Sequence, residues 1–271
     1  MGQLLSDIFG IRVASFVRCG DLWISPREIE THISRYSEHL FFYTHFLEWE
    51  VSRRGSCFLA GYRGRSFAIC TYHQVKNFNP EFIAVQGEGE HRYVTAGAMY
   101  WDTRLDSADW DDAIDFAAFD FSQSVGQGLV DRGRFCSWLG SEYLRSKEKV
   151  VGAIIVGFAD SDQRDDLEDD ESTGSKLTHM LLSKRIFVGE YCGDSYQNEI
   201  FLIKYFGDNI GSHNGLSGSP VFLICGDAGD FCVKFGGLVV RAGNGQFHCL
   251  KHTAIRRLLD QSFGDSRKRI V

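Results

Sequence analysis

The sequence is short of several features that would set it apart from ordinary globular proteins. It contains only 3 prolines against 29 glycines, which favours short strands joined by many turns. Positive charge is also in deficit: the formal net charge is −7 and no basic face is visible, so nucleic acid is not expected as a partner. No apolar run is long enough to span a membrane, so no transmembrane segment is expected.

Paired cysteine motifs and a secretory signal are missing as well. None of the 8 cysteines forms a C-x-x-C pair, which argues against a zinc ribbon or a redox motif. Their even number would allow disulfides, but the N-terminus lacks the charged start, apolar core and cleavage site of a signal peptide. We therefore expect reduced, mostly buried thiols in a cytoplasmic protein.

What is present favours a globular, β-rich chain. Hydrophobic residues make up 44% and charged residues 24%, which excludes a disordered or collagen-like protein. The 22 phenylalanines lean toward strands. Strands are predicted for eight apolar or β-branched segments, at 57–60, 66–70, 82–85, 92–95, 149–158, 199–204, 221–225 and 235–240.

Two helices flank the predicted strands. The run Ser25–Glu28 is a capping box with proline at the first helical position, which predicts a helix that begins at Pro26. Apolar residues continue at helical spacing as far as Leu40, although the pattern does not define where this helix ends. A second, closing helix is predicted over Lys251–Leu259.

The segment from Asp160 to Lys176 is strongly acidic and has almost no large apolar residue. This composition predicts an exposed loop. A calcium site is the alternative, but the D-x-D-x-D-G spacing of an EF-hand is absent.

The most informative motif is G-L-S-G-S-P at 215–220, which is followed by an apolar run at 221–224. A nucleophilic serine needs small neighbours, because the backbone turns tightly and its amides must reach the substrate's carbonyl oxygen. Taken alone, the motif fits an ordinary Gly/Ser turn before a strand equally well.

Other segments strengthen the first interpretation. Residues 215–220 resemble the G-x-S-G-G/S-P signature of the chymotrypsin (trypsin-like) peptidase family, in the form of its bacterial and organellar branch. Residues 64–73 resemble the strand that ends at the family's histidine, and residues 115–119 resemble the run that carries its aspartate. Three further runs resemble barrel strands of the family, at 55–59, 151–158 and 235–240.

The resemblance implies a serine–histidine–aspartate triad. Ser217 would be the nucleophile, His73 the general base and then acid, and Asp115 the residue that orients His73. The N–H groups of Gly215 and Ser217 would form the oxyanion hole. No metal and no organic cofactor is implied. Four nearby acids are alternatives to Asp115, namely Asp109, Asp111, Asp112 and Asp120.

The resemblance also implies the fold: all-β, with two packed antiparallel six-stranded β-barrels, the triad between them, and a helix at either end. The expected divisions are an N-terminal helical extension at 1–48, a first barrel at 49–130, and a second barrel with the C-terminal helix at 131–271. The segments 213–214 and 240–242 are expected to line the primary specificity pocket, with His213, Val240 and Arg241 as its substrate-binding residues.

Two departures from the family pattern matter. Bulky Tyr72 stands where the family has a small residue before its histidine, and Leu216 replaces the acid that precedes the serine in zymogen-activated members. The expected function is serine endopeptidase activity on a protein or peptide substrate, and a regulatory protein partner is left open. The alternative is a catalytically inactive trypsin-like fold that acts as a protein-binding module. An α/β-hydrolase esterase is disfavoured, because a strand follows Ser217.

Overall fold

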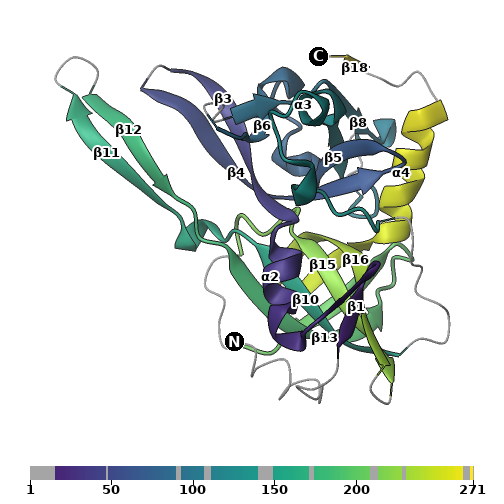
Figure 1. The fold of residues 1–271 in the computed structure, drawn as a ribbon. Coiled ribbons are helices and arrows are strands. Elements are labelled where there is room, and N and C mark those ends of the chain that lie inside the picture. Colours follow the sequence, from purple (N-terminus) through teal and green to yellow (C-terminus); the bar gives the residue numbers. More distant parts are fainter. Residues whose placement is uncertain are drawn as a thin grey trace.

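The structure is a computed structural model, and it shows a β-rich molecule with two halves side by side (Figure 1). Two long hairpins extend from one side of the molecule, and helix α4 (His252–Gly264) lies on the other side, along both halves (Figure 1). Residues 16–46, 48–89, 93–106, 111–139, 149–170, 174–207, 213–227, 230–264 and 269–270 are described.

One half is a closed barrel of six antiparallel strands. The strand order β15-β10-β13-β14-β17-β16 closes on itself, because β15 also pairs with β16. For this half, the prediction of a closed six-stranded antiparallel barrel is confirmed. The strands are β10 (Val150–Gly157), β13 (Arg185–Asp194), β14 (Ile200–Tyr205), β15 (Pro220–Asp227), β16 (Asp230–Gly243) and β17 (Gln246–Lys251).

The other half is a curled sheet with the order β18-β8-β9-β5-β4-β3-β6-β7. Strands β7 and β8 are separated only by Ala96 and Gly97, so the chain itself bends the sheet round. The second predicted barrel is thus a curled half-barrel. Its strands are β3 (Ser37–Phe46), β4 (Trp49–Tyr62), β5 (Arg65–Cys70), β6 (Ile83–Gln86), β7 (Tyr93–Thr95), β8 (Ala98–Trp101), β9 (Ala117–Asp120) and β18 (Arg269–Ile270).

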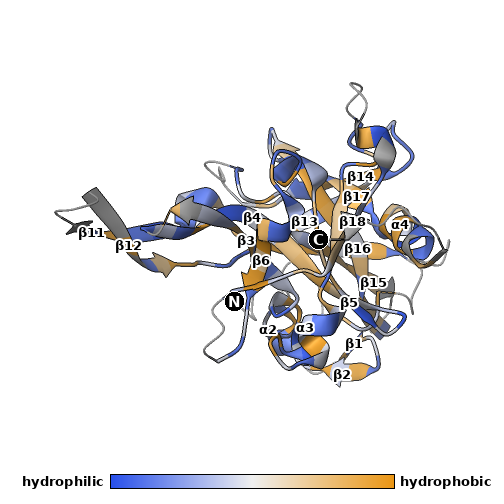
Figure 2. Cartoon of the chain, turned by 90° about the horizontal axis from the view of Figure 1, so that it is seen from above, coloured by the Kyte–Doolittle hydropathy of each residue, from blue (hydrophilic) through white to orange (hydrophobic). Residues whose placement is uncertain are grey.

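The continuous apolar run of β10 is explained by two cores. Successive strand residues point to opposite faces, so Ala153 and Ile155 enter the barrel interior, whereas Ile154 and Val156 enter a core shared with the curled sheet. Figure 2 shows apolar residues along β5, β15 and β16 in the centre of the molecule. The shared core fixes the two halves against each other and thereby positions whatever lies between them.

The eight predicted strands all coincide with observed strands, except that Arg92 lies outside the described residues. The predicted closing helix is confirmed as α4, whose Ile255 and Leu259 are fully buried. Within the described residues, no helix has the length and apolar character needed to cross a bilayer.

The predicted exposed loop at Asp160–Lys176 is wrong over most of its length. Strands β11 (Arg164–Asp170) and β12 (Gly174–Leu181) pair as an antiparallel hairpin that projects from the molecule (Figure 1). The hairpin is anchored at its base, where Arg53 pairs with Asp165, and near its middle, where the N–H of Leu177 donates to Glu48 O. Backbone hydrogen bonds between the two strands hold the hairpin together although its sequence lacks an apolar pattern, and the acidic side chains do not prevent this pairing.

The predicted N-terminal helix begins where expected but is much shorter. A 3₁₀ turn (Pro26–Glu28), capped by Ser25, leads into α2 (Ile29–Ser34). Leu40 does not continue this helix, because residues from Ser37 onward form β3. The aromatic residues of that segment favour a strand. The helical extension predicted at 1–48 therefore contains a strand of the curled sheet, while the other division, at residue 130, stays a prediction.

Two short strands near the N-terminus join the barrel. Strand β1 (Val17–Cys19) pairs in parallel with β16, and β2 (Leu22–Ile24) pairs with β1. The N-terminal part of the described chain therefore packs against the half that is formed by the C-terminal part of the sequence.

Candidate active site

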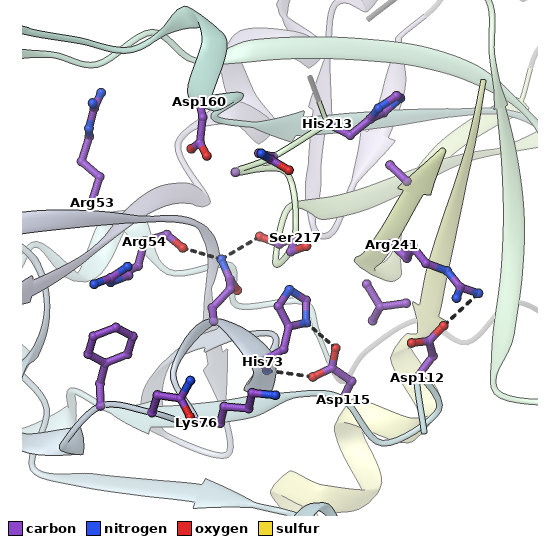
Figure 3. Close-up of a pocket in the computed structure, with 17 residues that line it drawn as sticks. Arg53, Arg54, His73, Lys76, Asp112, Asp115, Asp160, His213, Ser217 and Arg241 are labelled. Atoms are coloured by element: carbon purple, nitrogen blue, oxygen red, sulfur yellow. Dashed lines mark hydrogen bonds and ion pairs between the residues drawn. The ribbon is translucent and has the colours of Figure 1, made fainter. Parts of the chain in front are cut away.

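A cleft of about 810 Å³ lies between the two halves. His73 and Asp115 line it from the curled-sheet side, and Ser217 and Val240 line it from the barrel side (Figure 3). The three residues of the predicted triad, far apart in the sequence, are therefore brought into one cavity.

His73 is held by a buried carboxylate. It lies in a 3₁₀ turn (Tyr72–Gln74) that directly follows β5. Its Nδ1 lies 2.6 Å from Asp115 Oδ2, and its backbone N–H donates to Asp115 Oδ1 at 3.0 Å. The Asp115 side chain is 1% exposed and that of His73 is 34% exposed. Two bonds to one buried carboxylate fix the ring, so that Nε2 remains on the side away from Asp115.

The other acids proposed for this role are engaged elsewhere. Asp112 pairs with Arg241, and Asp120 pairs with Arg65. Asp111 accepts the N–H of Ala113 at 2.9 Å, and Asp109 lies outside the described residues. Among the described acids of this segment, Asp115 is the one in contact with the imidazole.

Of the two hydroxyl residues beside the ring, Thr71 contacts Nε2, whereas no hydrogen bond joins Ser217 and His73 in the described part of the chain. Ser217 lies beside the His73 ring, on the side away from Asp115 (Figure 3). Thr71 Oγ1 lies 3.4 Å from Nε2, which is a long contact for a hydrogen bond. The imidazole thus faces the cleft with the serine next to it.

The loop that carries Ser217 needs glycine at two positions. Gly215 and Gly218 have φ values of +85° and +81°, in the left-handed region that favours glycine. A Cβ at Gly218 would also collide with Ser56 O, and one at Gly215 would collide with Phe158 O. Both glycines are therefore explained by backbone conformation and by close packing, Gly218 against the curled-sheet half and Gly215 against the end of β10 in its own half.

The same loop presents two unpaired amides. Within the described residues, neither the N–H of Gly215 nor that of Ser217 donates a hydrogen bond. Asn214 O accepts the N–H of Asp160 at 2.9 Å. Because the C=O and N–H of a trans peptide point in opposite directions, the N–H of Gly215 points away from the Asp160 backbone.

Gln74 is a residue of the site that the sequence analysis did not assign. Its Nε2 donates to Ser217 O at 3.0 Å and to Arg54 O at 2.8 Å, so it joins the serine loop to β4. Its Oε1 accepts the N–H of Thr71 at 2.9 Å, which closes a capping box. The T-x-x-Q spacing was the signal that could have revealed it.

The residues expected in the specificity pocket all line the cleft. Val240 is buried, and Arg241 is half-exposed and paired with Asp112 at 3.0 Å. His213 Nε2 is buried without a hydrogen-bond partner among the described residues. Asn214 and Ala242, from the same two predicted segments, also line the cleft. Further lining residues that the sequence analysis did not assign are Arg53, Arg54, Lys76, Asn77, Phe78 and Asp160.

Tyr72, the bulky residue noted in the sequence before His73, does not line the cleft. Its ring stacks on Trp101, with the ring centroids 6.4 Å apart and an angle of 18° between the planes. Both rings pack against the core of the curled sheet. The departure is accommodated without filling the cleft.

Comparison with known proteins finds a structure of similar fold but no matching family. No protein-family model matches the chain, and no curated protein matches it either. Among solved structures, the chain is similar to the scabies mite inactivated protease paralogue S-I1, with 14% sequence identity and a TM-score of 0.48. The match covers 86% of this chain and 95% of the mite protein.

Proposed function

We propose that this protein is a serine endopeptidase in which Ser217 is the nucleophile, His73 the general base and Asp115 the residue that orients it. The observation that carries the proposal is the 2.6 Å contact between His73 Nδ1 and the buried Asp115 carboxylate, with Ser217 on the other side of the ring. A buried carboxylate on Nδ1 and a serine on the opposite side of the ring are two parts of the arrangement that activates a serine hydroxyl, and the bond from Ser217 to Nε2 would complete it.

The reaction follows from the positions of these groups. Ser217 Oγ attacks the substrate's carbonyl carbon while His73 Nε2 takes the hydroxyl proton. The resulting oxyanion accepts the N–H groups of Gly215 and Ser217, which have no other described acceptor. His73 then gives its proton to the leaving amine, and an acyl-enzyme remains. Water, deprotonated by the same Nε2, releases the second product and restores Ser217.

Asp115 contributes through charge and position. Because its carboxylate contacts Nδ1, it favours the tautomer with the proton on that nitrogen and leaves Nε2 free to accept one. It also stabilises the imidazolium that forms during the reaction. The 3.4 Å contact of Nε2 with Thr71 Oγ1 is weak enough to be exchanged for a bond to Ser217 when substrate binds.

One observation favours the second candidate, a protein-binding module without activity. His73 Nε2 lies near the Thr71 hydroxyl, so the ring has a partner other than the serine. In that case the cleft would hold a peptide without cleaving it.

A reducing, cytoplasmic setting is part of the proposal. Seven of the eight cysteines are buried and all eight are free thiols; only Cys192 is exposed. Burial raises the pKa of the Cys70 and Cys249 thiols well above the usual value, so these groups are unreactive.

The test is labelling with a fluorophosphonate probe, which reacts with activated serines. The wild type should be labelled, while Ser217→Ala and His73→Ala should not. Ser161→Ala, at an exposed serine outside the cleft, should be labelled like the wild type. A folded wild type that takes no label would favour the binding module.

A further inference from the structure

Arg54 on β4 is held rigidly at the wall of the cleft. Its guanidinium carbon lies 4.0 Å from the ring centroid of Phe78 and 5.5 Å from that of Phe42. The two rings are themselves packed, with centroids 4.3 Å apart. A guanidinium stacked on an aromatic pair keeps its orientation, so little conformational entropy remains to be lost when it binds a ligand.

Arg54 differs from the other arginines of the cleft in its charge balance. Arg53 pairs with Asp165 at 2.7 Å, and Arg241 pairs with Asp112 at 3.0 Å. Arg54 forms no ion pair with any acid in the described part of the chain. Burial lowers its pKa, which reflects the loss of solvation of a charge that no carboxylate compensates.

The acids that line the cleft do not neutralise this charge. Asp112 and Asp115 are bound to Arg241 and His73. Asp160 lies against Gly215, on the side of the cleft formed by the barrel half (Figure 3). The wall around Arg54 is therefore a positively charged part of an otherwise balanced cleft.

Arg54 is also close to the reacting serine. Its carbonyl oxygen and that of Ser217 accept hydrogen bonds from the same Gln74 amide, at 2.8 Å and 3.0 Å. In Figure 3 its side chain lies on the side of His73 opposite to Arg241. A peptide with its reacting carbonyl at Ser217 would pass Arg54 within a few residues, because an extended chain advances about 3.5 Å per residue.

We infer that Arg54 is a specificity-determining residue that binds an acidic side chain, aspartate or glutamate, of the peptide in the cleft. This inference rests on the proposed function, in which the cleft holds a peptide. The planar guanidinium can donate two parallel N–H bonds to a carboxylate. The protein as a whole carries a net charge of −7 and repels acidic peptides, so the selectivity arises from this local site.

The test measures binding, so that it does not depend on catalysis. The probes are two fluorescein-labelled octapeptides, one alternating alanine with glutamate and one alternating alanine with glutamine. Their dissociation constants for the Ser217→Ala protein are measured by fluorescence anisotropy. The acidic peptide should bind about tenfold more tightly, because it makes one charge-assisted hydrogen-bonded pair that the glutamine peptide lacks.

Substitution of Arg54 should remove this preference. In Ser217→Ala with Arg54→Gln, the ratio of the two dissociation constants should fall to about one, and Arg54→Lys should give an intermediate ratio because it keeps the charge but not the fork. The control is Arg63→Gln, which removes an arginine that also stacks on two rings, Tyr62 and Phe263, outside the cleft. It should keep the full preference. Thermal melts check that each variant is folded.

Two results overturn the inference: no preference for the acidic peptide in Ser217→Ala, or a preference that survives Arg54→Gln. The proposed function is judged separately by fluorophosphonate labelling. A labelled serine without an acidic preference removes the role of Arg54 and leaves the peptidase. An Arg54-dependent preference in a protein that takes no label removes the peptidase and leaves an acidic-peptide-binding module.

Discussion

The two walls of the cleft are built in different ways. On the curled-sheet wall, a side-chain contact determines the geometry: the buried Asp115 carboxylate holds His73 through both its ring and its backbone. On the barrel wall, the backbone determines it: Gly215 and Gly218 adopt positive φ, and the loop's carbonyls are bound by groups of the opposite half.

This difference teaches which kinds of change each wall tolerates. The first wall should respond to loss of charge or of a hydrogen bond even when the shape is kept. The second should respond to the addition of a single methyl group, because the chain has no space and no permitted conformation for it. The predictions below test this contrast.

The largest effect is expected where both walls meet, at the triad itself. Ser217→Ala and His73→Ala should each lower kcat/KM by roughly a million-fold, about 8 kcal/mol, on the scale known for such triads. The double variant should be no worse, because the base acts only through the serine. Asp115→Asn should be impaired less. The measurement is kcat/KM on a peptide that the wild type cleaves.

Additive losses for the Ser217 and His73 variants would contradict the assignment of a triad. Asp112→Asn is the control for Asp115→Asn, since Asp112 is bound to Arg241 at the edge of the same cleft. If Asp112→Asn were the more damaged enzyme, the orienting acid would have been assigned wrongly.

The backbone character of the barrel wall is tested by Gly218→Ala. The new methyl would meet Ser56 O at a residue with φ of +81°, so stability should fall by about 3 kcal/mol and kcat/KM by about a hundredfold. Gly64→Ala is the matched control: φ is +80° but no atom lies within 4 Å of the added methyl. It should cost only about 1 kcal/mol. Denaturant unfolding measures both, and equal losses would show that close packing of the loop is unimportant.

The contact between the halves should be sensitive to pH through His39. This residue is 1% exposed, lies 4.6 Å from the Phe158 ring, and burial lowers its pKa from 6.5 to about 4. The unfolded chain therefore binds a proton that the folded chain does not between pH 6.5 and 4. The free energy of unfolding should keep its full value above pH 6.5 and fall by about 3 kcal/mol as the pH is lowered to 4.

The check is urea unfolding of the wild type and His39→Phe from pH 7.5 to 4. The phenylalanine keeps an aromatic ring against Phe158 but cannot be protonated, so its stability curve should be flatter in this range. If both proteins lost stability in parallel, the acid sensitivity would lie in other groups.

A smaller effect is expected from the residue that joins the two walls. Gln74→Ala leaves the carbonyls of Arg54 and Ser217 without their donor, which should cost about 2 kcal/mol of stability and about tenfold in kcat/KM. Asn77→Ala, at another residue that lines the cleft, is the comparison. The melting temperature and kcat/KM are measured for both variants. If Gln74→Ala lowered neither, the two hydrogen bonds from Gln74 would contribute nothing to the site.

The smallest effect concerns the thiols. In native protein, Cys192 should react quickly with a thiol reagent, whereas the seven buried cysteines should react only after denaturation. Blocking Cys192 should leave kcat/KM unchanged, because it lies on β13, outside the cleft. A native count well above one, or fewer than eight thiols in denatured protein without reductant, would contradict this picture.

The parts of the fold that local pattern determines were predicted well. Runs such as 149–158 and 221–225 were recognised as strands because a strand that is buried on both faces is apolar throughout. The motif around Ser217 was visible because its glycines are required by the backbone at that point. The histidine was found through the strand before it, which ends next to the cleft.

The parts that depend on distant partners were not predicted. The β11–β12 hairpin is held by backbone pairing and by anchors such as Arg53 and Glu48 from another hairpin, none of which appears in its own composition. Leu40 fits a helical period, but pairing with β4 makes its segment a strand. The role of Gln74 depends on two carbonyl groups that lie 20 and 143 positions away in the sequence.

An early segment of the chain, β1, packs on the barrel, and a late one, α4, packs on the curled sheet. This exchange has a consequence for synthesis on the ribosome. Helix α4, made late, packs against the curled sheet made early: Tyr62 Oη donates to Asp260 at 2.6 Å, and Phe263 lies against Tyr62. Strand β1, made early, has to wait for β16. Neither half can therefore be completed before the residues of α4, up to Gly264, have emerged. We expect a nascent chain to have no assembled cleft, so that the proposed peptidase cannot act on neighbouring proteins while it is still being translated.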